Sequence, residues 1–79
     1  MKYVYILKSL ANPDRYYVGC ALDLKKRVSE HNSGQSIHTN KFMPWKLVNY
    51  FAFEDAQKAD KFELYLKTAS GRAFAKKHF

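Results

Sequence analysis

Glu63 occupies a position that favours a chemical role. It follows Ala59 by four residues and precedes Leu66 by three, so in a helix its carboxylate lies on or beside the apolar stripe. A charge at the edge of a core is costly unless it is paired or bound to a cation. The chemical interpretation is a ligand for a cation, and the structural alternative is an i,i+4 ion pair with Lys67.

An arginine and a histidine form a second candidate pair. Arg27 and His31 are four residues apart in a predicted helix and share a face with Leu24, so both lie at the margin of the core. The pair is either part of a functional site or a surface cation beside a histidine whose hydrogen bonds are satisfied.

Tyrosines and a glycine mark the predicted strands. Tyr3 and Tyr5 share one face of the first strand, and Tyr17 shares a face of the second strand with Gly19. The missing side chain at Gly19 would let a neighbouring backbone or a phosphate come close, or it would mark a β-bulge. The alternative for the tyrosines is a core position with a satisfied hydroxyl.

The balance of charge favours a polyanionic partner such as nucleic acid. Fourteen Lys and Arg against seven Asp and Glu give a formal net charge of +7 and a pI near 9.6. The basic residues, Lys26 among them, are spread along the chain, as a folded binding face requires. His38, Thr39 and Lys41 are candidates for phosphate contact, and a solvated loop is their alternative.

The first half of the chain predicts a hairpin, a helix and a loop. The aromatic and β-branched runs at 3–7 and 15–20 flank a turn-rich segment, which is typical of a β-hairpin. Asp23 is suited to cap a helix over 24–32. The polar stretch at 35–44 has the length of a loop that carries function or mobility.

The second half predicts a strand and two helices. Residues 45–53 form a strand that we expect to be buried on much of both faces. Asp55 caps a helix that runs to about Lys67, because the apolar residues follow helical spacing. The pair Ser70-Gly71 ends this helix, and residues 72–77 form a short third one.

The chain is long enough for one small domain, residues 1–79. The fold class is α/β in the broad sense, of the α+β kind: a three-stranded, mostly antiparallel sheet flanked by helices, in the order β-β-α-β-α-α. The longest uncharged runs are far shorter than a membrane span, and the chain opens without a signal-peptide pattern. With one cysteine and no internal disulfide, we expect a cytoplasmic protein without membrane contact.

Several short blocks, taken together, resemble one known family. Tyr3-Val4-Tyr5 and Tyr17-Val18-Gly19 resemble the two motifs that give the GIY-YIG nuclease superfamily its name. Arg27, His31 and Glu63 follow in the same order, as do His38-Thr39 and Pro44-Trp45-Lys46-Leu47-Val48. The whole set is similar to the small single-domain bacterial branch, whose domains are like those of excision-repair nucleases.

The resemblance implies metal-assisted hydrolysis of a nucleic-acid phosphodiester. Glu63 would hold a single divalent cation, Mg²⁺ or Mn²⁺, and Arg27 would stabilise the phosphate. Tyr5 and Tyr17 would line the site and position or deprotonate the attacking water, and His31 would lie near the phosphate. The predicted nucleic-acid contacts are Gly19, Lys26, His38, Thr39 and Lys41.

The expected function is that of a metal-dependent endonuclease, or nuclease-like protein, acting on DNA in repair or recombination. The sequence departs from the family pattern at Tyr3, where the motif has glycine, and at Cys20, where the excision-repair members carry lysine. It also has no asparagine after Glu63. The alternative is therefore a nucleic-acid-binding module on the same scaffold with weak or no turnover.

Overall fold

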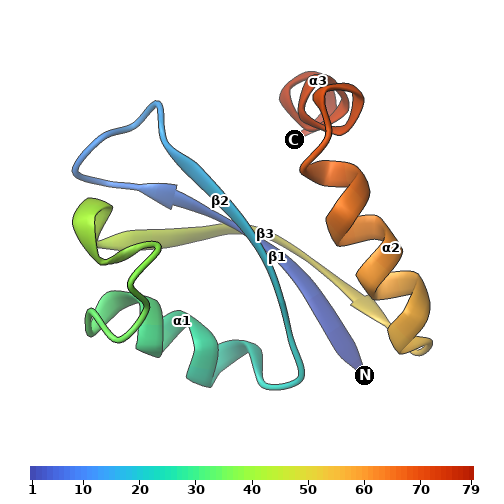
Figure 1. The fold of residues 1–79 in the computed structure, drawn as a ribbon, viewed down its shortest axis with the longest axis horizontal. Coiled ribbons are helices and arrows are strands. Elements are labelled where there is room, and N and C mark those ends of the chain that lie inside the picture. The colour runs from blue at the N-terminus through green and yellow to red at the C-terminus, as the bar shows by residue number, and fades with distance from the viewer.

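The computed structural model describes residues 1–79 and contains one three-stranded antiparallel sheet with three helices (Figure 1). The α+β class and the order β-β-α-β-α-α are confirmed. The strands lie in the order β2-β1-β3, so β1 is central and β2 is an edge. The elements are β1 (Lys2–Ser9), β2 (Tyr16–Ala21), α1 (Leu24–Asn32), a 3₁₀ turn (Asn40–Phe42), β3 (Trp45–Phe53), α2 (Ala56–Leu66) and α3 (Ala69–His78).

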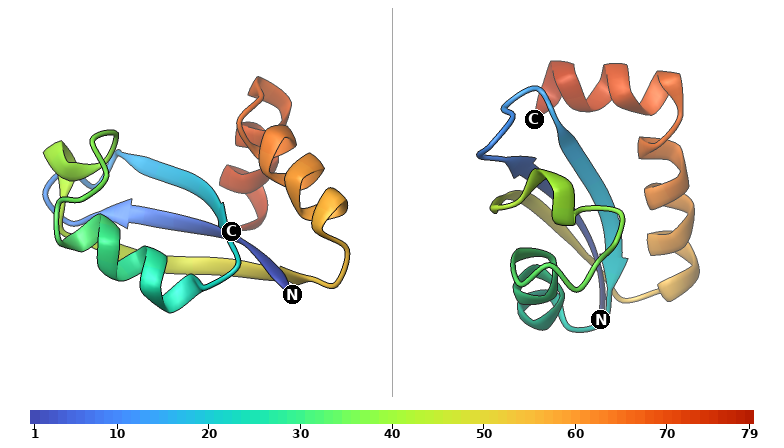
Figure 2. Two further views of the ribbon diagram at one scale, coloured as in Figure 1. Left: turned by 60° about the horizontal axis from the view of Figure 1, so that its bottom comes forward. Right: turned by 60° about the vertical axis from the view of Figure 1, so that its left-hand side comes forward.

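The helices cover both faces of the sheet, with α1 on one face and α2 and α3 on the other (Figures 1 and 2). Alternate residues of β1 serve the two faces. Tyr5 and Leu7 are fully buried in a core with the partly buried residues Leu24 and Val28 of α1. Val4 and Ile6 are buried in a second core, which includes the following residues of α2: Ala59, Phe62 and Leu66.

The third strand differs from its prediction, because only one end of it is deeply buried. Trp45 is buried, whereas exposed and partly exposed residues alternate along the rest of β3, with Tyr50 56% exposed. The register with β1 shifts between Ile6 and Leu7, which is a β-bulge. The bulge lets Leu47 pack in the core of α1 and Phe51 in the core of α2, so each face is served by only part of the strand.

The predicted capping residues begin α1 and α2. The side chain of Asp23 accepts a hydrogen bond from the backbone N–H of Lys26 at 3.0 Å. Asp55 accepts from the backbone N–H of Gln57 at 2.9 Å. Each carboxylate satisfies a donor that the first turn of a helix leaves without a partner.

The predicted boundary of the third helix was wrong. α3 begins at Ala69, and Thr68 caps it by accepting from the backbone N–H of Gly71 at 3.0 Å. Gly71 therefore lies inside the first turn of α3 and does not end a helix. A Cβ at this position would overlap the backbone carbonyl of Tyr65, so glycine lets α3 pack closely against the end of α2. None of the helices has the length and apolar character needed to cross a membrane.

Candidate active site

A buried chain of hydrogen bonds links β1, α1 and the loop before β3. The hydroxyl of Tyr5 lies 2.8 Å from Nε2 of His31, and Nδ1 of His31 lies 2.7 Å from Oγ1 of Thr39. The indole N–H of Trp45 donates to the carbonyl of Thr39 at 2.8 Å. All four residues are buried, and no buried side-chain polar atom is left without a partner. This network of hydrogen bonds therefore fixes the positions of Tyr5 and of the loop that carries Thr39.

The chemistry of Tyr5, His31 and Thr39 determines which group donates in each of these hydrogen bonds. Burial, followed by the neighbouring Tyr17, raises the pKa of Tyr5 far above its ordinary value, so the phenol stays protonated. Burial, followed by the charge of Arg27, lowers the pKa of His31, so the imidazole stays neutral at neutral pH. A phenol is the stronger donor of the two hydroxyls, and we assign its O–H as donating to Nε2. The N–H at Nδ1 then donates to Thr39.

Gly19 makes room for the buried tyrosine. It pairs with Tyr5 across the β1–β2 ladder, and a Cβ at Gly19 would overlap the phenol of Tyr5. The close approach that the sequence predicted is therefore made by a tyrosine ring, which leaves no space for a phosphate at this position.

Tyr17 is the second motif tyrosine, and it lies closer to the surface. It is partly buried, and its ring centroid is 5.0 Å from that of His31 and 6.3 Å from that of Tyr5. Because Tyr17 pairs with Leu7, its side chain is on the face of the sheet that α1 covers. The Nζ of Lys67 nevertheless lies 6.0 Å from the centroid of the Tyr17 ring. The end of α2 therefore reaches around the open edge of β2.

Glu63 and Lys67 form the ion pair that the sequence offered as the structural alternative. Oε2 of Glu63 is 3.1 Å from Nζ of Lys67, and the Glu63 side chain is 20% exposed while that of Lys67 is 47% exposed. No side-chain partner is found for Oε1. The pair satisfies the partly buried carboxylate, but it leaves one oxygen available to a ligand.

Arg27 lies on α1, which covers the other face of the sheet from α2. Its Nε lies 3.3 Å from Oε1 of Glu30, and its side chain is 47% exposed. The positive charge of Arg27 favours ionisation of Tyr5 and the negative charge of Glu63 opposes it, so both charges act on the same buried phenol. Neither effect outweighs burial.

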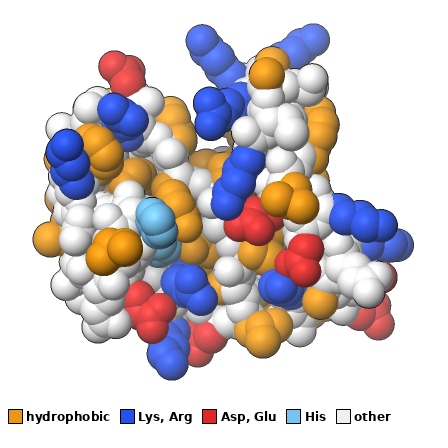
Figure 3. All heavy atoms as spheres, viewed as in Figure 1, with side chains coloured by type: hydrophobic (Ala, Val, Ile, Leu, Met, Phe, Trp, Pro, Cys, Tyr) orange, Lys and Arg blue, Asp and Glu red, His pale blue; other side chains and the backbone are white.

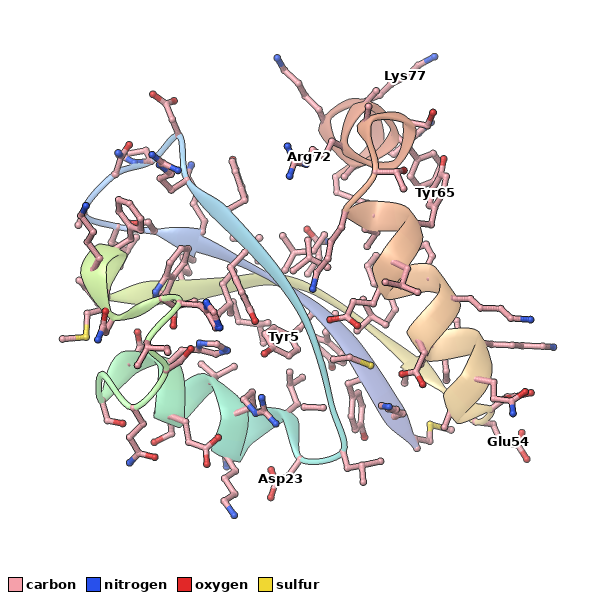
Figure 4. All side chains as sticks on the ribbon, viewed as in Figure 1. Tyr5, Asp23, Glu54, Tyr65, Arg72 and Lys77 are labelled. Carbon is pink, nitrogen blue, oxygen red and sulfur yellow. The ribbon has the colours of Figure 1, made fainter.

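Four residues act on Tyr5 or Tyr17 from both sides of the β2 edge, and we assign them to one site, which we call the β2 cleft: Tyr17, Arg27, Glu63 and Lys67. Figure 3 shows a notch between the end of the β1–β2 hairpin and the α2–α3 side of the molecule, with Lys and Arg side chains along the α2–α3 wall. Figure 4 shows Tyr5 beneath it, between the sheet and α1, and Arg72 on the side of α3 toward β2. The cleft thus has a phenol, a carboxylate and several cations around one opening.

The other predicted nucleic-acid contacts are divided between the surface and the interior. Lys26 and His38 are exposed and border two depressions that also include Arg27. Thr39 is buried and bonded to His31, so it does not reach the surface. Lys41 is exposed beside the ring of Phe42, at 5.9 Å from its centroid, away from the β2 cleft.

Comparison with known proteins identifies the family. The model of the GIY-YIG catalytic domain matches residues 1–77. The chain belongs to this family. GIY-YIG domains form a nuclease superfamily whose members act on nucleic acid and generally depend on a divalent metal.

Two bacterial relatives match most of this chain. A UPF0213 protein of Clostridium perfringens is 38% identical over 68 residues, which cover 85% of this chain and 71% of the relative. A UPF0213 protein of Listeria welshimeri is 33% identical over 69 residues, covering 86% of this chain and 74% of the relative. The chain therefore resembles the small UPF0213 branch of the GIY-YIG family.

The donor set of the β2 cleft determines which metal it suits. No group of three or more His, Cys, Asp or Glu side chains is positioned to hold a metal ion. A closed structural zinc site is therefore excluded. A single carboxylate with one unpaired oxygen suits Mg²⁺, which keeps several waters and takes further ligands from a substrate phosphate. Glu63 fits this role.

The contact between Lys67 and Tyr17 was not predicted from the sequence. The i,i+4 spacing predicted the ion pair with Glu63, but contact with a ring on another strand depends on where α2 docks. The sequence allowed a hydrogen-bonded histidine as the alternative for His31. In the structure His31 is bonded to Tyr5 and Thr39, and it is also buried.

Proposed function

We propose that this GIY-YIG protein is an endonuclease that hydrolyses DNA phosphodiester bonds with the help of a divalent cation. The observation that carries the proposal is the β2 cleft, where Lys67 contacts the Glu63 carboxylate and lies over the Tyr17 ring, and where the charges of Arg27 and Glu63 both act on the phenol of Tyr5. A phosphate in this cleft would meet cations from both lobes. The net charge of +7 favours a polyanionic substrate.

Glu63 is the residue that would hold Mg²⁺ or Mn²⁺, through the oxygen that Lys67 does not contact. A bound cation supplies Lewis-acid polarisation of the phosphate and lowers the pKa of water. Glu63 also carries the negative charge that would draw such an ion into an otherwise basic cleft. Its partial burial and its pairing fix the direction of the carboxylate.

Arg27 is suited to the substrate phosphate. Its guanidinium is exposed on one side and presents donors in a planar fork that matches phosphate oxygens. Charge accumulates on the phosphoryl oxygens as water attacks, so a cation fixed there lowers the barrier. The Glu30 carboxylate limits the movement of Arg27 without burying it.

The two tyrosines have different roles in this proposal. Tyr17 borders the cleft, so its hydroxyl would orient the attacking water by a hydrogen bond. Tyr5 is fully buried and keeps its proton, so it acts with His31 as a positioning residue under Tyr17. The new P–O bond forms from the water as the bond between phosphorus and the departing ester oxygen breaks. Bulk water takes the proton that the attacking water loses and supplies one to the departing oxygen.

A DNA-binding module without turnover is the second candidate function. The observation that favours it is the Glu63–Lys67 ion pair, which already satisfies one oxygen of the only carboxylate in the β2 cleft. In this alternative, Glu63 is a structural partner of Lys67 and no cation is required.

Nicking of supercoiled plasmid and cleavage of branched DNA, measured over a titration of Mg²⁺ or Mn²⁺, separate the two functions. The nuclease requires divalent-dependent cleavage that Glu63→Gln abolishes, while affinity for DNA without metal is unchanged or slightly increased. Glu54→Gln is the matched control, because Glu54 is exposed beside the start of α2 and lies apart from the cleft (Figure 4). DNA binding without cleavage under every condition would contradict the nuclease and favour the DNA-binding module.

A further inference from the structure

We propose that Lys67 is an exchangeable positioning residue of the β2 cleft. It holds the Glu63 carboxylate while no divalent cation is bound, and it transfers to a substrate phosphate beside Tyr17 when a cation takes the carboxylate. This inference rests on the proposed function, because it requires Glu63 to bind a cation.

The ion pair has the properties of a contact that exchanges. It joins one ammonium to one carboxylate oxygen at 3.1 Å, and the Lys67 side chain is nearly half exposed. Exposed pairs of this kind are weak, because water screens them and a long side chain must be ordered to form them. A divalent cation on the free Oε1 neutralises the charge that the two carboxylate oxygens share, and it repels the ammonium beside it. Cation binding is therefore expected to displace or loosen Lys67.

The structure of the α2–α3 junction shows that the pair is not needed to close the helix. The backbone N–H of Lys67 bonds to the carbonyls of Leu64 and Tyr65. The hydroxyl of Thr68 donates to the carbonyl of Tyr65 at 2.6 Å and accepts from the N–H of Gly71. The turn is thus held by backbone and Thr68, and the side chain of Lys67 is free to move without unfolding it.

The second position available to Lys67 lies over Tyr17. Its Nζ is already 6.0 Å from the centroid of that ring, on the side from which α2 borders the cleft. A flexible four-carbon stem with three donors can turn from a carboxylate to a nearby phosphate oxygen. A phosphate held between Arg27 and a cation on Glu63 would lie within reach of the Lys67 ammonium. One lysine would then respond to both the cation and the substrate.

Other ion pairs of the protein lack this arrangement. Lys2 and Asp60 pair at 2.6 Å, but Asp60 also accepts from the thiol of Cys20, on the face of the sheet away from Tyr17. On α1, Arg27 pairs with Glu30, and the Glu30 carboxylate has no tyrosine of the cleft beside it. Lys67 alone joins the acidic residue and the phenol of the β2 cleft.

Mn²⁺ affinity, measured by calorimetry on the full chain without DNA, tests the first half of the proposal. We expect Lys67→Met to bind Mn²⁺ about two- to fivefold more tightly than Lys61→Met, because the competing ammonium is gone. Lys61 is the matched control, an exposed lysine of α2 that has no ion pair. Lys67→Gln repeats the test if the Met variant is poorly folded. Glu63→Gln should remove Mn²⁺ binding in either background.

DNA affinity, measured with a duplex oligonucleotide in saturating Ca²⁺, tests the second half. Lys67→Met should bind about two- to tenfold more weakly than Lys61→Met, and Lys67→Arg should restore most of the loss. An exchangeable residue predicts that its loss raises Mn²⁺ affinity and lowers DNA affinity. If Lys67 had only a structural role, its loss would change neither affinity. If the wild type binds Mn²⁺ through Glu63 but Lys67→Met and Lys61→Met do not differ, the inference fails and the proposed function stands. If neither the wild type nor Lys67→Met binds Mn²⁺, the metal-dependent function itself fails.

Discussion

At the scale of single residues, burial separates the two motif tyrosines. Tyr5 and Tyr17 lie on the same face of the sheet, yet Tyr5 is enclosed against Gly19 and His31 while Tyr17 borders the β2 cleft. Enclosure raises the pKa of Tyr5, so the phenol keeps its proton and is not available as a base. The surface position leaves Tyr17 as the tyrosine that can meet water and substrate.

Stability should fall as the pH is lowered through the range in which histidine titrates. Burial and Arg27 lower the pKa of His31, with Glu30 acting in the opposite direction, so the folded protein resists protonation there. The unfolded chain takes up that proton near pH 6.5. The free energy of unfolding is therefore highest above about pH 6.5 and decreases by up to about 1.4 kcal/mol per pH unit below it, until His31 protonates in the folded state.

Urea unfolding at several pH values between 7.5 and 5 measures this effect, with His31→Gln and His38→Gln for comparison. The unfolding free energy of His31→Gln should lose most of its pH dependence in this window. That of His38→Gln should retain it, because His38 is exposed. Asp60 does not interfere, because Lys2 lowers its carboxyl pKa and its contribution is lost only below about pH 4. Identical slopes for the wild type and His31→Gln would show that His31 is not responsible.

Sequence was informative about residue types but left their roles open. Spacing alone placed Glu63 beside an apolar stripe and Arg27 on the same face as His31. Whether a histidine accepts from a tyrosine or contacts a phosphate depends on a neighbour 26 positions away in the chain. Such a partner has no local signal, because the hydrogen bond exists only after α1 packs on the sheet.

At the scale of elements, the capping residues correctly predicted where α1 and α2 begin. The glycine at position 71 led to a wrong prediction of where α3 begins. Asp23 and Asp55 cap α1 and α2 as expected, because an aspartate that precedes a helical pattern satisfies the first free N–H groups. Gly71 resembled a helix stop, but tertiary packing requires it within α3. The bulge in β3 likewise had no sequence signal that we could identify.

Gly71→Ala should destabilise the protein, although alanine has the higher helix propensity. The new Cβ would overlap the backbone at the end of α2, which cannot move as a side-chain tip can. We expect a loss of about 1–3 kcal/mol of unfolding free energy, as for other overpacked sites. Urea unfolding measures it, with Ser70→Ala as the exposed control in the same turn. A stabilised Gly71→Ala would mean that α3 does not pack at this distance from α2.

At the scale of the whole molecule, the fold places its two lobes on opposite faces of a sheet and lets them meet around one edge. Tyr17 is on the α1 face, yet Lys67 reaches it from α2 because β2 has no strand beyond it. Arg72 lies on the side of α3 toward β2 and extends the basic wall of the cleft (Figure 4). The general fold follows from the order of elements, but this meeting of lobes depends on docking angles that the sequence pattern does not contain.

The central claim is that the β2 cleft is the site of DNA hydrolysis. It is tested most directly by the single-turnover cleavage rate at saturating protein, for the wild type, Arg27→Ala and the control Arg15→Ala. Arg15 is an exposed arginine over the ring of Phe42, outside the cleft. We predict that Arg27→Ala weakens DNA binding by about 1–3 kcal/mol and, at saturation, lowers the rate by a further 10²–10³, approximately the effect of losing one oxyanion donor. Arg15→Ala should cleave at nearly the wild-type rate. Equal saturated rates for Arg27→Ala and the wild type would contradict the account.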